Sequence, residues 1–217
     1  MSALSAGQLH VWWSPSDALP ADAVRWLSDD ERMRYERFYF DCDRLSYVAA
    51  HAMLRLLLER YGSQYAWTTM GVGIHGKPYL PGDIEFNLSH TRGMAACAFS
   101  LAPVGVDVES AHRAGDWHRL VPQVLSEHER AALQSLPPAR QQLRFYQAWT
   151  CKEAWSKATG DGLHTDFRGL DVLHPQPGLF LASVDTMPGF QGAVCSTTTP
   201  SHLKIRQFVW PGLDAGN

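Results

Sequence analysis

Two acidic motifs constrain what this chain can fold into, because the first has the alternation of a strand and the second the spacing of a helix. The first motif is Gly-Val-Asp-Val-Glu at 105–109, and the second is Trp-Thr-Cys-Lys-Glu-Ala-Trp-Ser-Lys at 149–157, followed by two nearby glycines. Residues two apart on a strand share a face, as Asp107 and Glu109 would. Residues four apart on a helix share a face, as Glu153 and Lys157 would.

If this strand and helix pack together, three carboxylates and one lysine converge on one point. Carboxylate oxygens are hard ligands, and Mg²⁺ is typically held by few carboxylates together with phosphate groups of a substrate. The pattern therefore indicates metal-assisted chemistry on a phosphate ester. Taken alone, Asp107 and Glu109 are explained as well by a solvent-facing strand edge. Glu153 and Lys157 alone would be a surface helix pair, worth about 0.2–0.5 kcal/mol.

Composition places the chain among globular proteins and excludes several classes. With 217 residues, 45% hydrophobic and 19% charged, it can bury a core of one large or two small domains. A net charge of −3 gives no basic surface for nucleic acid. The ten histidines show no metal-ligand spacing along the sequence.

The cysteines and the apolar runs predict the compartment. The four cysteines are scattered singly, which favours a reduced cytoplasmic chain over a disulfide framework. The start of the sequence lacks the basic and apolar regions of a signal peptide. No apolar stretch approaches the length needed to cross a membrane, so no membrane partner is expected.

Periodicity and turn residues predict helices and strands in both halves of the chain. In the first half, one helix is expected at 20–37 and another from a cap at Asp43 to Gly62. Strands are expected at 9–13, 84–88, 94–100 and 104–109. Residues 71–82 are expected to form a loop. The last two strands, joined across Ala102-Pro103, predict an antiparallel hairpin. In the second half, a capping box opens a helix at 126–136, a second helix spans 139–159, and strands are expected at 170–173, 180–184, 192–196 and 203–210.

Neither half alternates strands and helices as a parallel sheet would, so the predicted fold class is α+β. The two halves are of similar size and meet near Pro103 to Ser110. We therefore expect one unit made of an N-terminal half, 1–104, and a C-terminal half, 105–217.

With these motifs placed, the chain resembles the 4′-phosphopantetheinyl transferases of the surfactin-synthetase (Sfp) type. The resemblance rests on four blocks in order: Gly76-Lys77-Pro78, then Phe86-Asn87-Leu88-Ser89-His90-Thr91, then residues 105–109, and finally residues 145–163. One block alone would be weak, and Gly76-Lys77-Pro78 by itself is a turn with a solvated lysine. Four blocks in order with compatible spacing are specific.

The resemblance implies a fold and an activity. Single-chain members of this family are pseudo-dimers of two related α/β halves with coenzyme A in the cleft between them. They move the phosphopantetheine arm of coenzyme A onto a serine of an acyl or peptidyl carrier protein and release adenosine 3′,5′-bisphosphate. Coenzyme A as substrate, Mg²⁺ with Mn²⁺ as an alternative, a carrier protein as partner and a monomeric state are therefore expected.

The resemblance also implies roles for residues of the two acidic motifs. Asp107, Glu109 and Glu153 would hold Mg²⁺, and Glu153 or a water near it would take the proton of the carrier serine. Lys157 would neutralise the pyrophosphate and protonate the leaving phosphate. Asp107 and Lys157 also count among the expected coenzyme contacts. Lys152 lies on another helix face, where it would meet phosphate or solvent.

Further coenzyme contacts are implied in the first half. Lys77 and Pro78 would border the adenine and its phosphates, and Ser89 and His90 would reach the phosphates, including the 3′-phosphate. The pattern departs from the family around the second helix. Arg44 fits one of the positions where the family carries a basic residue. Ser46 and His51 stand at positions where family members often have arginine. Arg34 and Arg37 from the preceding helix would compensate for these two replacements.

Two other functions stay open from sequence alone. One is a metal-dependent phosphotransferase or hydrolase acting on another nucleotide-like substrate. The other is a non-catalytic protein that binds coenzyme A or a carrier domain. A serine hydrolase is disfavoured because Ser89 and His90 are adjacent and no Gly-x-Ser-x-Gly elbow is present. Cys151 is interpreted as structural, since no partner that would activate a thiol is evident.

Overall fold

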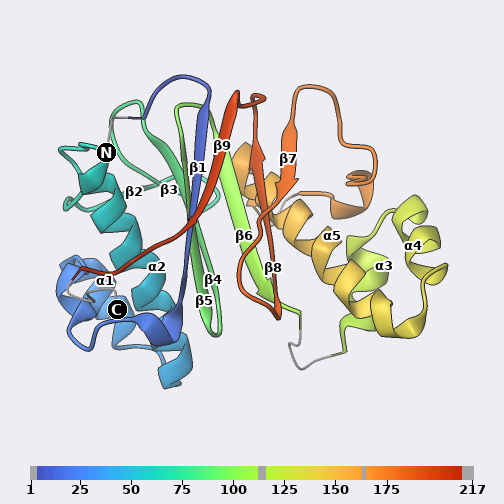
Figure 1. The fold of residues 1–217 in the computed structure, drawn as a ribbon, viewed down its shortest axis with the longest axis horizontal. Coiled ribbons are helices and arrows are strands. Elements are labelled where there is room, and N and C mark those ends of the chain that lie inside the picture. The colour runs from blue at the N-terminus through green and yellow to red at the C-terminus, as the bar shows by residue number, and fades with distance from the viewer. Residues whose placement is uncertain (1–3, 112–115, 163–164, 212–217) are drawn as a thin grey trace, which may run out of the picture.

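The computed structural model describes residues 4–111, 116–162 and 165–211, whose elements form two halves side by side (Figure 1). The sheet of the first half has the strand order β4-β5-β1-β9, and that of the second half has the order β6-β8-β7. Helix α2 packs on the first sheet and helix α5 on the second, so that the two long helices lie on the outer sides of the sheets (Figure 1). The chain is therefore an α+β protein built of two halves.

The first half contains β1 (Gln8–Pro15), η1 (Ser16–Ala18), η2 (Ala23–Trp26), α1 (Asp29–Tyr35), α2 (Asp41–Arg60), β2 (Gly71–Val72), β3 (Pro78–Tyr79), β4 (Glu85–Thr91) and β5 (Met94–Ser100). The remainder contains β6 (Val104–Ser110), η3 (Trp117–Arg119), α3 (Val121–Val124), α4 (Glu127–Gln134), α5 (Pro138–Thr159), η5 (Phe167–Gly169), β7 (Phe180–Ser183), β8 (Phe190–Ser196) and β9 (His202–Gln207). Among the described residues, no helix has the length and apolar content needed to cross a bilayer.

The helix signals of the second half are confirmed. Ser126 and Glu129 form the expected capping box at the start of α4. Helix α5 starts with Pro138, whose missing N–H costs nothing in a first turn, and ends at Gly160 with a left-handed φ of 82°. Leu163, the last residue of the fourth sequence block, lies outside the described residues.

Three expected elements are wrong in detail. The helix expected over 20–37 is divided into η2 and α1, because Ser28 caps α1 through the Glu31 N–H and starts a new helix. Asp43 lies inside α2, whose N-cap is Phe40, and its carboxylate instead binds Arg92. Residues 170–173, expected as a strand, form a turn after η5.

The hairpin expected between 94–100 and 104–109 is also wrong. Strand β5 pairs with β4 and β1, whereas β6 pairs with β8, so the short connection at 101–103 carries the chain from one sheet to the other. Strand β9 then returns to the first sheet, where it runs parallel to β1. The division at 104/105 stays a prediction, and residues 202–207 belong by hydrogen bonding to the sheet of the first half.

Helix α5 lies unusually close to β6 at Gly105. A Cβ on this glycine would overlap the Ala154 carbonyl oxygen and the Ala158 nitrogen and lie 2.9 Å from the Lys157 carbonyl carbon. Only a residue without a side chain permits this approach of backbone to backbone. The two sequence motifs are therefore packed directly against each other, which is the condition under which their side chains can converge.

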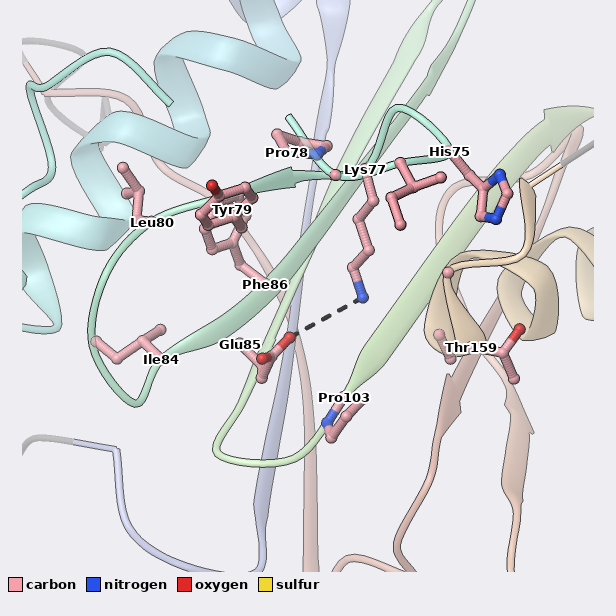
Figure 2. Close-up of a pocket in the computed structure, with 14 residues that line it drawn as sticks. His75, Lys77, Pro78, Tyr79, Leu80, Ile84, Glu85, Phe86, Pro103 and Thr159 are labelled. Carbon is pink, nitrogen blue, oxygen red and sulfur yellow. Dashed lines mark ion pairs between the residues drawn. The ribbon is translucent and has the colours of Figure 1, made fainter. Parts of the chain in front are cut away.

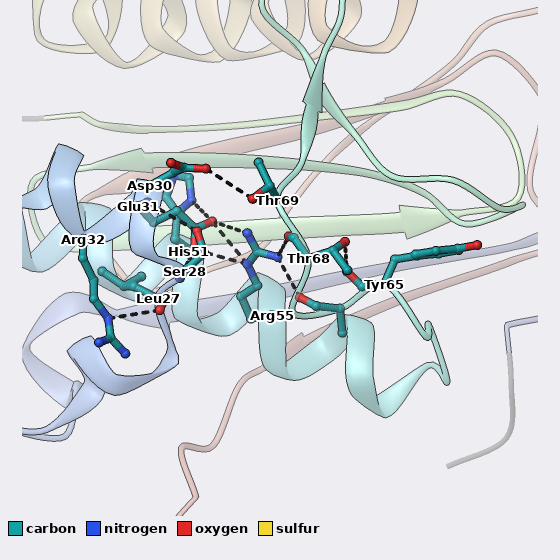
Figure 3. A network of polar contacts seen from close by, with 11 residues as sticks. Leu27, Ser28, Asp30, Glu31, Arg32, His51, Arg55, Tyr65, Thr68 and Thr69 are labelled. Atoms are coloured by element: carbon teal, nitrogen blue, oxygen red, sulfur yellow. Dashed lines mark hydrogen bonds and ion pairs between the residues drawn. The ribbon is translucent and has the colours of Figure 1, made fainter.

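A buried polar network fixes α1 against α2 (Figure 3). The Arg55 guanidinium donates to both carboxylate oxygens of Glu31 and to the carbonyl oxygens of Ala66 and Thr68. The Glu31 carboxylate also lies 2.9 Å from Nδ1 of His51. Arg55 is 1% exposed, so removing either charged partner would leave the other buried and unpaired.

We expect Gly105→Ala to destabilise the protein by about 1–3 kcal/mol or more, because the obstructing atoms are backbone and cannot rotate away. Urea unfolding followed by tryptophan fluorescence measures the change. Gly73→Ala is the matched control, since its added Cβ meets only a carbonyl oxygen of Lys77 at 3.4 Å. Equal unfolding midpoints for the two variants would show that the close approach is not required.

The Glu31 network predicts a pH window of stability. Burial raises the pKa of Glu31, but hydrogen bonds and charge from His51 and Arg55 outweigh it and lower that pKa from 4.5 to about 2. The unfolded chain therefore binds more protons between these values, and about 3 kcal/mol of stability is lost as the pH falls from 4.5 to 2.

Urea unfolding of the wild type and Glu31→Gln across this pH range measures the effect, with Glu36→Gln on the exposed end of α1 as control. The Glu31→Gln variant should lose the steep acid dependence, and the control should keep it. The same acid slope in all three proteins would contradict the assignment.

Candidate active site

Strands β4 and β6 face each other across the boundary between the two sheets, and polar side chains of β4 join them. Asn87 Oδ1 accepts from the Val106 N–H at 2.9 Å, and Ser89 Oγ accepts from the Val108 N–H at 3.4 Å. Thr91 Oγ1 donates to Glu109 at 3.1 Å. These contacts, here called the β4–β6 seam, arise because residues 87, 89 and 91 share one face of β4.

Asp107 lies at the centre of the seam and is 4% exposed. Its Oδ1 accepts from Ser89 Oγ at 2.8 Å and from Lys157 Nζ at 2.6 Å. The Lys157 ammonium also donates to Ser89 Oγ at 3.1 Å and to the Val106 carbonyl oxygen at 3.3 Å. One residue from each of β4, β6 and α5 therefore meets at a single hydrogen-bonded centre.

Glu153, one turn before Lys157 on α5, is half-buried beside this centre. Burial and the negative charges of Asp107 and Glu109 raise the pKa of Glu153, while Lys157 opposes the increase. The interaction shows that the three carboxylates lie within electrostatic reach of one another. The Lys157 ammonium lies 2.6 Å from Asp107 and balances part of their negative charge.

The chemistry of these carboxylates fits a hard divalent cation. Asp107 Oδ2 is buried and makes no hydrogen bond, while Oδ1 is occupied by Ser89 and Lys157. A buried carboxylate oxygen without a donor is costly unless a cation or a polar ligand approaches it. Glu109 and Glu153, both half-buried, add further carboxylate oxygens of the kind that a hard cation such as Mg²⁺ binds.

A cavity of about 740 Å³ opens on the opposite face of β4. His90 and Leu88 line it from β4, Tyr47 and His51 from α2, Arg34 from α1, and Gly76 and Pro78 from the loop before and at β3. The Arg34 guanidinium lies 5.9 Å from the centre of the Tyr47 ring. The structure thus brings the predicted residues His90 and Pro78 together with Arg34 and His51, two basic side chains suited to phosphate.

Lys77 points away from that cavity. Its ammonium donates to the Val104 carbonyl oxygen at 3.0 Å and lies 4.0 Å from Glu85 Oε2. As Figure 2 shows, it enters a second cavity of about 390 Å³ bordered by Pro103 and Thr159. Pro78 lines both cavities, whereas Lys77 is among the lining residues of the second one and not of the first.

Two predicted coenzyme contacts are placed elsewhere. Arg44 pairs with Asp41 at 3.0 Å at the start of α2 and is not among the residues that line the His90 cavity. Lys152 is fully buried, and its ammonium contacts Glu129 at 2.6 Å and the carbonyl oxygens of Phe167 and Leu170. The expectation that Lys152 meets phosphate or solvent is corrected, because protein groups occupy its donors.

Cys151 fits its structural interpretation. Burial raises the pKa of this thiol to about 11, which leaves it protonated at neutral pH. All four cysteines are free thiols.

Sequence reasoning gave no role in the site to Asn87 or Thr91, and it gave no partner to Glu129. The strand period of two would have placed Asn87 and Thr91 on the same face as Ser89, so that signal was present. Glu129 was recognised only as part of a capping box, and no local pattern connects it with Lys152, because the two residues lie on different helices.

Comparison with known proteins agrees with this arrangement. A model of the 4′-phosphopantetheinyl transferase superfamily matches residues 103–208, and a model of the N-terminal part of a 4′-phosphopantetheinyl transferase matches residues 11–101.

The chain is 33% identical over 170 residues to the 4′-phosphopantetheinyl transferase HetI of Nostoc sp., covering 74% of this chain and 72% of that protein. It is 31% identical over 185 residues to a 4′-phosphopantetheinyl transferase of Bacillus subtilis, covering 78% and 82%. Sfp of Bacillus subtilis is 25% identical over 188 residues, covering 80% and 83%. The chain therefore belongs to the 4′-phosphopantetheinyl transferase superfamily and has the two-part organisation of its Sfp-type members.

Proposed function

We propose that this transferase moves the 4′-phosphopantetheine group of coenzyme A to a serine of an acyl or peptidyl carrier protein in a Mg²⁺-dependent reaction. Asp107, Glu109 and Glu153 would hold the metal, which supplies charge neutralisation at the phosphate under attack. The observation that supports this assignment best is the buried Asp107 oxygen without a donor, beside a lysine that already balances the other oxygen.

The serine hydroxyl of the carrier is the nucleophile in the proposed step. Its oxygen forms a bond to the phosphorus that bears the pantetheine arm, and the bond from that phosphorus to the bridging pyrophosphate oxygen breaks. Glu153, half-buried one turn before Lys157 on α5, takes the hydroxyl proton. Adenosine 3′,5′-bisphosphate leaves with the electron pair of the broken bond.

Lys157 has the position to assist the departing phosphate. Its ammonium is shared among Asp107, Ser89 and a backbone carbonyl, so it can exchange one of these acceptors for a phosphate oxygen without being newly desolvated. Such a donor stabilises the charge that develops on the leaving group and can return a proton to it. Ser89 fixes the Asp107 carboxylate and adds a hydroxyl at the same point.

The His90 cavity is the proposed site for the nucleotide end of the coenzyme. Arg34 and His51 would pair with the 3′-phosphate, and Tyr47 offers a ring surface beside them. Pro78 would border the adenine. The placement of Lys77 and Arg44 argues for weaker contributions from these residues than the family pattern implies.

Carriers of fatty-acid, polyketide or nonribosomal peptide synthesis are the proposed partners. We also propose a monomer in the cytoplasm, in keeping with two halves that supply the site residues from one chain and with four free cysteines.

The first prediction for this function concerns Glu153. Glu153→Gln should lower the rate of phosphopantetheine transfer by about 10²–10⁴-fold because the proton acceptor is lost, while coenzyme A still binds. Intact-protein mass spectrometry of an apo carrier incubated with coenzyme A and Mg²⁺ measures transfer, and a chelator tests the metal requirement. Calorimetry measures coenzyme binding.

Glu127→Gln is the matched control, since that glutamate is exposed at the start of α4. Transfer by the Glu153→Gln variant at the wild-type rate would disprove the role of Glu153. Binding of coenzyme A without transfer by the wild type to any of the three carrier types would favour a binding protein.

The second prediction concerns Lys152. Lys152→Met should destabilise the protein by about 3–5 kcal/mol, because the buried Glu129 carboxylate loses its charged partner. At a temperature where the variant stays folded, its KM for coenzyme A should equal that of the wild type. Denaturant unfolding and steady-state kinetics measure both, with Lys204→Met on an exposed face of β9 as control. A large rise in KM with unchanged stability would restore Lys152 as a coenzyme contact.

A further inference from the structure

Two histidines and an aspartate converge in the second half, outside the seam and both cavities described above. His128 lies in the first turn of α4, and Asp171 and His174 lie in the turn after η5. Nδ1 of His128 is 3.0 Å from Asp171 Oδ2, and Nδ1 of His174 is 3.4 Å from the same oxygen. One ligand atom from each side chain lies within 4.8 Å of the other two.

We propose that this cluster binds a divalent transition-metal ion of the Zn²⁺ type. Two imidazole nitrogens with one carboxylate oxygen form a ligand set that suits Zn²⁺. Mg²⁺ prefers sites made of oxygen ligands. In a tetrahedral site with bonds of about 2.0–2.1 Å, neighbouring ligand atoms are about 3.3 Å apart. The two nitrogen-to-oxygen separations of 3.0 and 3.4 Å are close to that value before any metal-induced adjustment.

The carboxylate of this cluster is already oriented by the backbone. Asp171 Oδ1 accepts from the Leu173 N–H at 2.9 Å, which leaves Oδ2 facing both histidines. The His174 N–H donates to the Asp171 carbonyl oxygen at 3.2 Å and closes the turn that brings Asp171 and His174 together. A metal would therefore meet a carboxylate whose direction is already set by the backbone hydrogen bond.

The position of the turn relative to α4 is fixed by Glu129. The Glu129 carboxylate caps α4 through Ser126, accepts from the Val172 N–H at 2.8 Å and pairs with the buried Lys152. His128 is the residue before Glu129, and Asp171 is the residue before Val172. The hydrogen bond between Glu129 and Val172 therefore holds His128 of the helix opposite Asp171 and His174 of the turn. A pre-organised metal site needs such a fixed arrangement of its ligands.

The site is open to water on one side. The side chains of His128 and His174 are 56% and 72% exposed, and that of Asp171 is 26% exposed. A bound ion would complete its shell with water and would join α4 to the turn at 171–174. The inference is independent of the transferase reaction, since none of the three residues belongs to the seam.

Titration of the full-length protein with Zn²⁺ tests the proposal, with millimolar Mg²⁺ present to occupy the acidic motif. A chromophoric chelator in competition measures stoichiometry, and thermal unfolding measures stabilisation. The wild type should bind one Zn²⁺ per chain at this site. At a free Zn²⁺ concentration a hundredfold above Kd, its Tm should rise by about 5–10 °C.

His128→Ala and His174→Ala lie on different elements, and each should lose both the bound Zn²⁺ and the rise in Tm. His118→Ala is the matched control, because His118 is also exposed and lies 3.4 Å from one carboxylate, that of Asp116, which pairs with no second histidine among the residues that the structure describes. The control should behave as the wild type. Undiminished Zn²⁺ binding by both the His128→Ala and the His174→Ala variants, or no binding by the wild type, would overturn the proposal.

Discussion

The backbone-to-backbone contact of α5 with β6 at Gly105 is the constraint on which the site depends. Helix α5 carries Glu153 and Lys157, and β6 carries Asp107 and Glu109, so the depth at which the helix rests on the strand sets the distance between the two motifs. The Cβ of any other residue at 105 would overlap backbone atoms of Ala154 and Ala158, so the helix would have to move away from the strand. Hydrogen bonds such as that of Lys157 with Asp107 at 2.6 Å tolerate only small displacements.

The β4–β6 seam joins the two separate sheets at the site. The N–H groups of Val106 and Val108 face β4 and are satisfied by the side chains of Asn87 and Ser89 rather than by its backbone. Ser89 thereby serves two elements at once, since it accepts from β6 and donates to Asp107. The joint between the halves and the charged centre are consequently one hydrogen-bonded structure, and a change in either would disturb the other.

Much of this arrangement could be predicted from local pattern. The strand period of two and the helix period of 3.6 identified the faces of β6 and α5, and capping residues marked α4 and the end of α5. Pairing between distant segments could not be predicted in this way. Lys152 was expected to meet phosphate or solvent from another face of its helix, whereas its partner Glu129 is known only once α4 and α5 are packed. The contact between His128 and Asp171 could not be predicted from local pattern either, because 43 positions separate the two residues.

Strand β9 affects the order in which the two halves can fold during synthesis. The first sheet takes β9 beside β1, and Trp210 donates to Ser14 and stacks on Trp26 at 5.9 Å. The half that leaves the ribosome first thus lacks part of its sheet and core until the last described residues emerge. Strands β6, β8 and β7 have by then all been synthesised, so the later half is free to fold ahead of the earlier one. Emergence of residues 202–210, rather than of the first hundred residues, therefore completes the sheet and core of the first half.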